Sequence, residues 1–328
     1  MEDFKFDGKS TKVQQLAEYI QDAIAANELK VGEKIPSINH LSRQFSVSRD
    51  TVFKALSDLR TRGVIDAIHG KNFYVASHTR NILLLLDEYS PFKEVLHTML
   101  VSRLPPTYKI DLWFHQYNEH LFNNIILESI GRYHKYLVMN YDNEKFSDVL
   151  SKIDRKKLLL LDFGKFDKDG YSYVCQDFDK GLYEALDSIK SDLGKYKKLV
   201  FVLNKTHKHP KSSKTAFGDF CLDNRFEFAI LDEIPEKGVI HEEFFYLVIK
   251  QEDVVKIIKQ GHASGLKPGR DYGLLAYNEN PFFEVIEDGI SSIGIDWQEM
   301  GRIAADFVLN NCTIQTYLPT VIKKRGSF

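Results

Sequence analysis

The spacing of apolar residues predicts three helices near the start of the chain. Over residues 11–24, apolar side chains recur at three- and four-residue steps, which is the pattern of an amphipathic helix. A shorter helix is predicted after Ser37 and a third one between Ser48 and Gly63, because serine caps helix starts and glycine ends helices. The turn at 46–48 is three residues long. So short a turn between two helices is typical of a helix-turn-helix.

Two brief strand-like runs follow the third helix, at residues 64–68 and 73–76. Gly70 and Asn72 stand between them, and both residue types accept the positive φ that the tip of a hairpin requires. A hairpin beside a helix-turn-helix is a wing. The sequence therefore predicts an N-terminal winged helix-turn-helix domain over residues 1–78.

The remaining residues, 79–328, alternate strand-like apolar runs with helical stretches. This alternation predicts a doubly wound α/β architecture, in which helices cover both faces of a parallel sheet. About 250 residues of this pattern exceed what one sheet of five strands requires, so two similar lobes with a cleft between them are expected. The strands are predicted at residues 82–86, 109–114, 136–139, 157–161, 171–175, 199–203, 226–230, 244–249, 272–276, 292–295 and 317–322. The helices are predicted at residues 91–103, 119–133, 144–153, 180–193, 211–222, 252–264 and 297–310.

Composition fits a globular protein of two domains. The chain has 328 residues, 43% of them hydrophobic and 27% charged, and at roughly 150 residues per domain this length predicts about two. Its 44 Lys and Arg nearly balance 46 Asp and Glu, which excludes a polycation that coats nucleic acid.

Cysteine spacing and apolar runs bear on the cellular setting. Cys175, Cys221 and Cys312 lie far apart, which excludes a Cys-x-x-Cys metal or redox motif and fits a reducing, cytoplasmic environment. The first ten residues lack the apolar segment of a signal peptide. The longest apolar run, at 82–86, is far shorter than the ~20 residues that cross a bilayer, so no membrane partner is expected.

The helix-turn-helix region has a local excess of positive charge. Between residues 35 and 75, six Lys and Arg face three Asp. Helical phase places Arg49, Asp50, Phe53 and Lys54 on the outer face of the third helix, where a recognition helix meets base edges. Charged residues opposite an apolar stripe are also the ordinary solvated face of a helix, so charge alone leaves DNA binding open.

The order of short motifs favours DNA binding. Pro-Ser at 36–37, Val-Ser-Arg-Asp-Thr-Val at 47–52 and Gly-Lys-Asn-Phe-Tyr-Val at 70–75 together resemble the winged helix-turn-helix of the GntR family of bacterial transcriptional regulators. Where that family has an acidic-Arg pair this chain has Ile-Asn at 38–39, and Phe53 replaces a usual basic residue. The resemblance implies double-stranded operator DNA as a partner. The residues expected to contact it are Ser37, Asn39, Arg43, Ser48, Arg49, Thr51, Lys54, His69, Gly70 and Lys71.

A second resemblance covers the later part of the chain. Residues 265–278 and 295–305 are similar to the sugar-binding domain shared by lac-type repressors and periplasmic binding proteins. A GntR-like domain joined to this module resembles the arabinose-repressor type of chimera. The resemblance implies a homodimer and a small-molecule sugar effector bound in the cleft.

The same resemblance implies an effector pocket at strand ends. A carboxylate and two amides would bond to sugar hydroxyls, an aromatic ring would cover the sugar, and a lysine falls near the family's sugar-binding Arg. These residues are Tyr89, Phe92, Asp162, Lys214, Gln251 and Asn278. One acid and two amides favour a neutral monosaccharide, a pentose or a 6-deoxyhexose. A phosphorylated sugar is the better prediction if Lys214 enters the cleft with Lys208 or Lys211. Asp177, in contrast, is expected mainly to cap a helix.

We therefore expect a transcription regulator, with a repressor as the prediction although the sequence does not encode the sign of regulation. Two alternatives stay open: a constitutive DNA-binding protein whose second domain only dimerises, and a sugar-processing enzyme fused to a DNA-binding domain. Gly-x-Ser-x-Gly, P-loop and His-Glu-x-x-His motifs do not occur. The His-x-His at 207–209 lies in a Lys-rich loop that would repel a cation. No catalytic residue, cofactor or metal is therefore expected.

Overall fold

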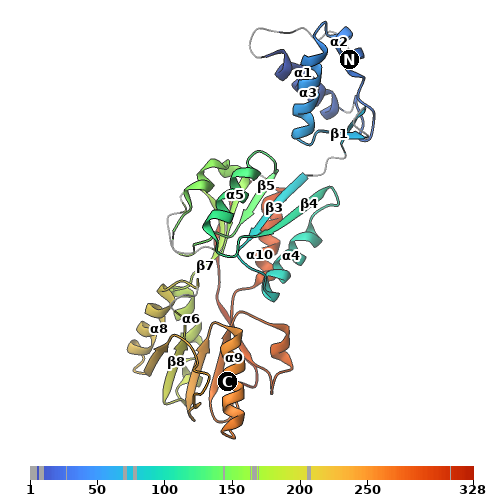
Figure 1. Cartoon of the computed structure of the whole chain (residues 1–328). Helices are drawn as coiled ribbons and strands as arrows, with labels where there is room; N and C mark the ends of the chain where they lie inside the picture. The colour runs from blue at the N-terminus through green and yellow to red at the C-terminus, as the bar shows by residue number, and fades with distance from the viewer. Residues whose placement is uncertain are drawn as a thin grey trace. The chain divides into compact units, whose positions relative to one another are not determined.

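A computed structural model of the chain describes residues 6, 11–26, 28–68, 72–76, 80–142, 145–162, 164, 168, 170–204, 208–310 and 312–328. The chain divides into two compact units. The first is made of Met1–Ile82 with Leu104–Asp111 and Ser129–His134, and the second of the rest (Figure 1). The predicted boundary between residues 78 and 79 lies outside the described residues.

The N-terminal part contains the predicted helix-turn-helix and hairpin. Its elements are α1 (Lys12–Ala25), α2 (Ile38–Gln44), α3 (Arg49–Thr61), β1 (Ile65–Ile68) and β2 (Asn72–Val75). The two strands pair antiparallel. Ile35 N donates to Phe73 O at 2.8 Å, so the segment before α2 adds to the hairpin.

The apolar stripes of these helices form one core. Leu16 and Ile20 of α1, Leu41 of α2, and Val52 and Leu56 of α3 are all fully buried together. Burial of side chains of this size stabilises a fold by about 1.5–3 kcal/mol each, which offsets the cost of ordering three short helices. The opposite face of α3 is thereby left toward solvent.

Two six-stranded sheets make up most of the remaining structure. The first has the order β13-β7-β6-β5-β3-β4 and the second β14-β12-β11-β10-β8-β9. The first contains β3 (Arg80–Leu86), β4 (Tyr108–Phe114), β5 (Lys135–Val138), β6 (Leu158–Leu161), β7 (Ser172–Gln176) and β13 (Gln315–Leu318). The second contains β8 (Lys198–Val202), β9 (Glu227–Leu231), β10 (Phe244–Val248), β11 (Gly273–Tyr277), β12 (Ser291–Gly294) and β14 (Val321–Lys323).

Seven helices and three 3-10 turns connect these strands in the described residues. The helices are α4 (Pro91–Arg103), α5 (Glu119–Ser129), α6 (Lys180–Ser188), α7 (Lys190–Leu193), α8 (Ser212–Asp223), α9 (Gln251–Ala263) and α10 (Trp297–Leu309). The turns are η1 (Asp148–Lys152), η2 (Arg155–Lys157) and η3 (Pro281–Glu284).

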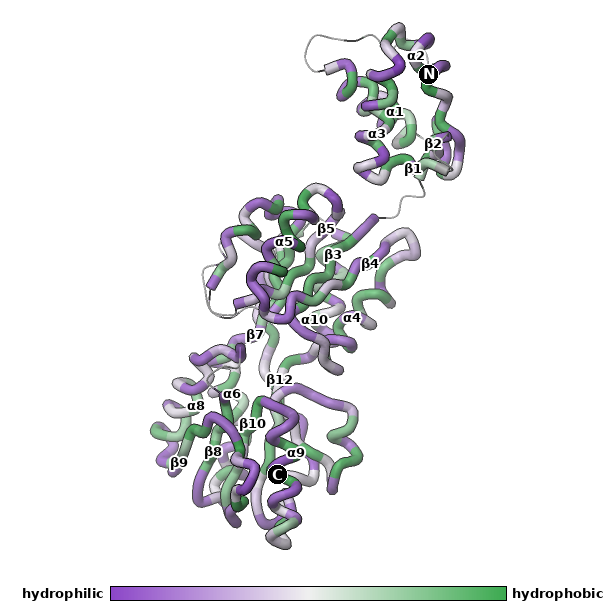
Figure 2. The backbone as a smooth tube through the Cα atoms, in the orientation of Figure 1, coloured by the Kyte–Doolittle hydropathy of each residue, from purple (hydrophilic) through white to green (hydrophobic). Residues whose placement is uncertain are grey.

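The central strands of the second sheet, β8, β10, β11 and β12, are buried on both faces, as the predicted architecture requires. Val200 packs in a cluster with Ile257 of α9, whereas its neighbour Phe201 packs in another cluster with Phe217 of α8. Successive side chains of a strand point to opposite faces, so the helices cover both sides of the sheet. The strands accordingly carry long hydrophobic stretches (Figure 2). The α/β fold class is confirmed.

The chain crosses between the two sheets three times within the second unit. It crosses after β7, again between β12 and α10, and a third time between β13 and β14. The predicted single strand at 317–322 is therefore wrong, because β13 pairs with β7 and β14 pairs antiparallel with β12. Pro319 separates the two strands, and its missing N–H and fixed φ prevent one continuous ladder.

Three predicted helices differ from the structure. The segment 145–153 forms the short η1, since the Ser147 hydroxyl donates to Asn140 instead of capping a helix; residue 144 lies outside the described residues. The helix predicted at 180–193 is divided into α6 and α7, where the Ser188 hydroxyl bonds to Ala185 O at 2.6 Å and competes with the backbone. Helix α5 ends at Ser129, ahead of Gly131 with its φ of +77°.

The packing of α10 against α4 depends on a glycine. A Cβ atom on Gly301 would lie 2.6 Å from Leu96 O, whereas one on Gly218 of α8 would meet only Phe228 ring atoms at 3.8 Å. We expect Gly301→Ala to lower the free energy of unfolding by about 1–3 kcal/mol, because α4 must move away. Gly218→Ala, the matched control, should raise it by about 0.5–1 kcal/mol through helix propensity. Denaturant titration of both variants checks this; equal effects would contradict the close approach.

Candidate functional site

The outer face of α3 presents the side chains expected to contact DNA. Ser48 caps the helix by accepting from Thr51 N at 3.0 Å, and the two hydroxyls are 2.8 Å apart. Arg49 and Phe53 are exposed, as predicted from helical phase. Lys54 is exposed too, and it pairs with Asp50 at 2.7 Å. An exposed ion pair of this kind contributes little to stability. The Lys54 ammonium can therefore leave Asp50 and pair with a phosphate.

Helix α2 adds further polar groups. Ser37 caps it by accepting from His40 N at 3.2 Å. Asn39 and Arg43 are exposed, and Arg43 Nε donates to the Asn39 carbonyl at 3.2 Å, which leaves the Asn39 side-chain amide available. The three predicted wing contacts, His69, Gly70 and Lys71, lie outside the described residues.

A cavity of about 610 Å³ lies at the ends of strands from both sheets in the second unit. Five of the six predicted effector residues line it: Tyr89, Phe92, Asp162, Gln251 and Asn278. Lys214 is not among the lining residues. It lies on α8, 3.9 Å from Asp232. The structure therefore does not bring the predicted lysine contact to this cavity, although Lys208 does line it.

Asp162 offers the cavity an unsatisfied hydrogen-bond acceptor. It directly follows β6 with a φ of +50°, and its Oδ1 is buried without a hydrogen-bond partner in the part of the chain that the structure describes. Burial raises the pKa of Asp162 to about 7, and the neighbouring Asp87 adds to this while Lys93 opposes it. A ligand that donates a hydrogen bond to this oxygen would remove the desolvation cost.

A buried ion pair stands beside Asp162. Asp87, which follows β3, pairs with Lys93 of α4, and their side chains are 9% and 5% exposed. Asp87 also accepts from the Tyr117 hydroxyl at 2.7 Å and from Glu88 N at 2.7 Å. These three donors occupy Asp87, whereas Asp162 Oδ1 is buried and has no partner in the described residues. Asp87 was not among the predicted site residues, although it directly follows a predicted buried strand, as Asp162 does.

His115 holds Tyr117 in place. Tyr117 N donates to His115 Nδ1 at 3.1 Å, so His115 Nε2 carries the proton and donates to Met139 O at 3.1 Å. Burial lowers the pKa of His115 to about 4, which keeps the imidazole neutral at physiological pH. Burial and the nearby Asp87 raise the pKa of Tyr117, so its hydroxyl remains a donor.

The amides at the opposite strand ends supply donors. The Asn278 Oδ1 accepts from Trp297 Nε1 at 3.3 Å, and the Gln251 Oε1 accepts from Asn280 Nδ2 at 3.0 Å. With both carbonyl oxygens engaged, the NH₂ groups of Asn278 and Gln251 remain to donate to a ligand. The site thus combines a free acceptor, Asp162, with two amide donors.

Segments that cross between the sheets meet at the cavity wall. Gln176 Nε2 donates to the Tyr277 hydroxyl at 2.6 Å and to Thr320 Oγ1 at 3.2 Å. The His209 ring lies against Tyr277 with centroids 4.7 Å apart. Burial raises the pKa of Tyr277, which keeps this hydroxyl neutral. Asp177 accepts from Asp179 N and Lys180 N, both at 3.0 Å, so it bonds to the start of α6 as expected for a capping residue.

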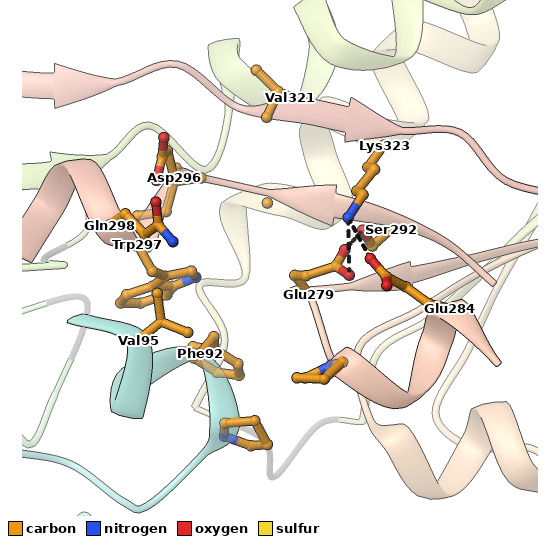
Figure 3. A pocket seen from close by; sticks show the side chains of 14 residues that line it. Phe92, Val95, Glu279, Glu284, Ser292, Asp296, Trp297, Gln298, Val321 and Lys323 are labelled. Carbon is orange, nitrogen blue, oxygen red and sulfur yellow. Dashed lines mark hydrogen bonds and ion pairs between the residues drawn. The ribbon is translucent and has the colours of Figure 1, made fainter. Parts of the chain in front are cut away.

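A second cavity of about 490 Å³ adjoins the first and shares Phe92 with it. Phe92 packs against Trp297 with ring centroids 4.8 Å apart, and Figure 3 shows both rings on one side of the cavity. On the other side, Lys323 lies 3.0 Å from Glu284 and 3.8 Å from Glu279 (Figure 3). Trp297, which lines this second cavity, donates through its indole Nε1 to Asn278, which lines the first cavity.

Metal ligation and membrane insertion find no support in the described residues. No group of three or more His, Cys, Asp or Glu side chains there could hold a metal ion. None of the helices in those parts of the chain has the length and apolar character needed to cross a bilayer.

Comparison with known proteins identifies the N-terminal domain. Residues 12–75 match the family model described as bacterial regulatory proteins, gntR family. The chain is 33% identical over 91 residues to the uncharacterized HTH-type transcriptional regulator YydK of Bacillus subtilis (strain 168), covering 28% of this chain and 39% of that protein. It is 39% identical over 72 residues to the probable fructoselysine utilization operon transcriptional repressor of Escherichia coli (strain K12). This match covers 22% of this chain and 30% of that protein. The chain thus spans well under half of these relatives.

Solved structures show the fold of the second unit. The trehalose repressor from Escherichia coli matches with a TM-score of 0.61 and 15% identity over 74% of this chain and 99% of that one. A LacI family transcriptional regulator from Lactobacillus casei with bound sucrose matches with a TM-score of 0.61 and 15% identity. This match covers 76% of this chain and 100% of that one. The predicted combination of a GntR-type helix-turn-helix and a LacI-like fold is confirmed.

The raised pKa of Asp162 predicts a pH dependence of stability. Its pKa of about 7 exceeds the ~3.9 of an unfolded chain, so the folded state binds this proton more tightly and the contribution to stability falls as the pH rises from about 4 to about 7. Asp162→Asn keeps the shape, tolerates positive φ and has no charge. We expect it to be more stable than wild type at pH 8 by on the order of 2 kcal/mol, a figure reduced for partial exposure to the cavity, and equal near pH 4. Unfolding measured across this range checks it; parallel curves would contradict the raised pKa.

Proposed function

We propose that this chain is a ligand-responsive transcription regulator, specifically a repressor, that binds operator DNA as a homodimer and senses a neutral monosaccharide. The observation that carries this proposal is the presence, in one chain, of a GntR-type helix-turn-helix and a strand-end cavity with an unpartnered carboxylate oxygen. A cytoplasmic location, where operator DNA lies, goes with the proposal.

The exposed face of α3 supports sequence-specific DNA binding. Arg49 stands in the first turn of the helix that follows the tight turn, where a recognition helix contacts base edges. An arginine bonds to guanine through two parallel donors, and the hydroxyls of Ser48 and Thr51 suit phosphates. Two copies of this domain in a homodimer would contact two half-sites of a symmetric operator.

The charge balance of the cavity supports a neutral ligand. Its acidic lining residues are Asp87, Glu88, Asp162 and Glu252, and its basic ones are Lys93, Lys208 and Lys250. Lys93 is already paired with Asp87, so the lining residues contain no buried basic cluster of the kind that a phosphate requires. Hydroxyl groups suit the Asp162 acceptor and the two amide donors, and Phe92 or Tyr89 can cover the apolar face of a pentose or 6-deoxyhexose ring.

Ligand binding would alter operator affinity through the crossings between the two sheets. A sugar bonded to Asp162 on one sheet and Asn278 on the other favours one arrangement of the two sheets over others. The effect on DNA binding equals the difference in sugar affinity between those arrangements. A second domain that served only for dimerisation would not require a ligand acceptor, such as the unpartnered Asp162 oxygen, in its cavity. An enzyme would convert the sugar, which product analysis would detect.

We expect Arg49→Ala to weaken binding to a selected operator duplex by about 1–3 kcal/mol and to relax its base specificity, because a bidentate base contact is lost. Arg60→Ala is the matched control: this exposed arginine lies at the far end of the same helix and should leave the specificity unchanged. Gel-shift titration at fixed salt measures both. Equal specificity of wild type and Arg49→Ala would remove Arg49 from base recognition.

Calorimetry of the full chain with free and phosphorylated pentoses and 6-deoxyhexoses tests the effector. A neutral sugar should bind, and Asp162→Ala should cost on the order of 2 kcal/mol in binding because sugar hydroxyls lose their acceptor. Lys214→Ala, outside the cavity, should bind sugar like wild type. Tight binding of phosphorylated forms alone would overturn the neutral assignment.

A further inference from the structure

Phe53 places an apolar ring among polar groups on the face of α3 proposed to contact DNA. It is 52% exposed and does not join the hydrophobic core of its domain. Arg49 lies four residues earlier along the same line of the helix, and the Asp50–Lys54 ion pair occupies the neighbouring line. A single exposed apolar side chain is ordinary on a protein surface. The position of Phe53 suggests a function, because under the proposed function this exposed face of α3 enters the major groove.

We propose that Phe53 contacts the 5-methyl group of a thymine in the major groove and makes the operator specific for thymine at that position. This inference rests on the proposed DNA-binding function and deepens it. A phenyl ring has no donor for a phosphate and no acceptor for a base amino group. Among the four bases of unmodified DNA, thymine alone presents a methyl group in the major groove, and apolar side chains recognise it.

Helix geometry places this thymine relative to the base that Arg49 contacts. Four residues advance an α-helix by about 6 Å, and successive base pairs are about 3.4 Å apart. The Phe53 contact therefore falls within about two base pairs of the Arg49 contact. Loss of one buried methyl group corresponds to about a fourfold loss of affinity at each half-site.

The experiment begins by selecting tight-binding duplexes from a random DNA pool with the full chain. Each thymine of the selected duplex is then replaced in turn by deoxyuridine, which removes the 5-methyl group and leaves base pairing unchanged. At one position per half-site, we expect deoxyuridine to lower the affinity about fourfold. Cytosine at that position should bind weakly, and 5-methylcytosine should recover part of the loss because it restores the methyl group.

Two variants test whether the phenyl ring of Phe53 causes the difference in affinity between the thymine and deoxyuridine duplexes. Phe53→Ala should bind the thymine and deoxyuridine duplexes equally. Because a homodimeric variant loses the contact at both half-sites, its affinity should be close to that of wild type for a duplex with deoxyuridine at both positions. Lys54→Ala, the matched control on the neighbouring line of α3, should keep the fourfold discrimination while its affinity for all duplexes falls. Because both side chains are exposed, thermal unfolding should confirm that each variant folds like wild type.

The outcomes separate this inference from the function on which it rests. If the chain selects a duplex but no deoxyuridine substitution weakens binding, or if Phe53→Ala still discriminates, the thymine contact is wrong and operator binding stands. If no duplex is enriched over the random pool, the proposed DNA-binding function fails and the thymine contact fails with it.

Discussion

The hydrogen bonds from Gln176 to Tyr277 and Thr320 are the interaction on which the ligand cavity depends. Gln176 ends β7 of the first sheet, Tyr277 ends β11 of the second, and Thr320 lies where the chain crosses between them. The bond to Tyr277 is buried and the bond to Thr320 is partly buried, so loss of the Tyr277 bond would leave unsatisfied polar groups at a cost of about 1–3 kcal/mol. They hold the strand ends of both sheets around one space, so residues about 116 positions apart, such as Asp162 and Asn278, line the same cavity.

Within that cavity, paired groups determine which group is available. Lys93 and Tyr117 occupy Asp87, and Trp297 and Asn280 occupy the carbonyl oxygens of Asn278 and Gln251. The buried Asp162 Oδ1 remains as an acceptor and the two amide NH₂ groups remain as donors, and Glu88 and Glu252 add further carboxylates to the lining. This set suits hydroxyl groups better than a phosphate. The raised pKa of Asp162 reflects the energetic cost of burying this carboxylate, whose Oδ1 has no partner in the described residues. Selectivity in this site therefore depends as much on the groups that occupy Asp87 as on Asp162 itself.

In the N-terminal domain, which we propose contacts DNA, the residues proposed for function are those that the core leaves exposed. Burial of Val52 and Leu56 fixes the rotation of α3, and this alone directs Arg49 and Phe53 outward. The polar and apolar groups on that face need no further support from neighbouring elements. Fixing the face through the core also explains why helical phase in the sequence sufficed to identify it.

Local patterns in the sequence determined the three N-terminal helices, the hairpin strands and most strands of the two sheets, since each depends on neighbours within a few residues. Asp162, Gln251 and Asn278 were predicted from the resemblance to the sugar-binding domain of lac-type repressors, which places its site at strand ends. The tertiary structure alone decided the division of 317–322 between two sheets, because Pro319 breaks the ladder and pairing partners lie far away in sequence. It also decided that Lys214 faces Asp232 and that Asp87 is paired by Lys93 and Tyr117. These pairings depend on which segments, far apart in sequence, come into contact. The periodicity of apolar residues along one segment carries no information about such contacts.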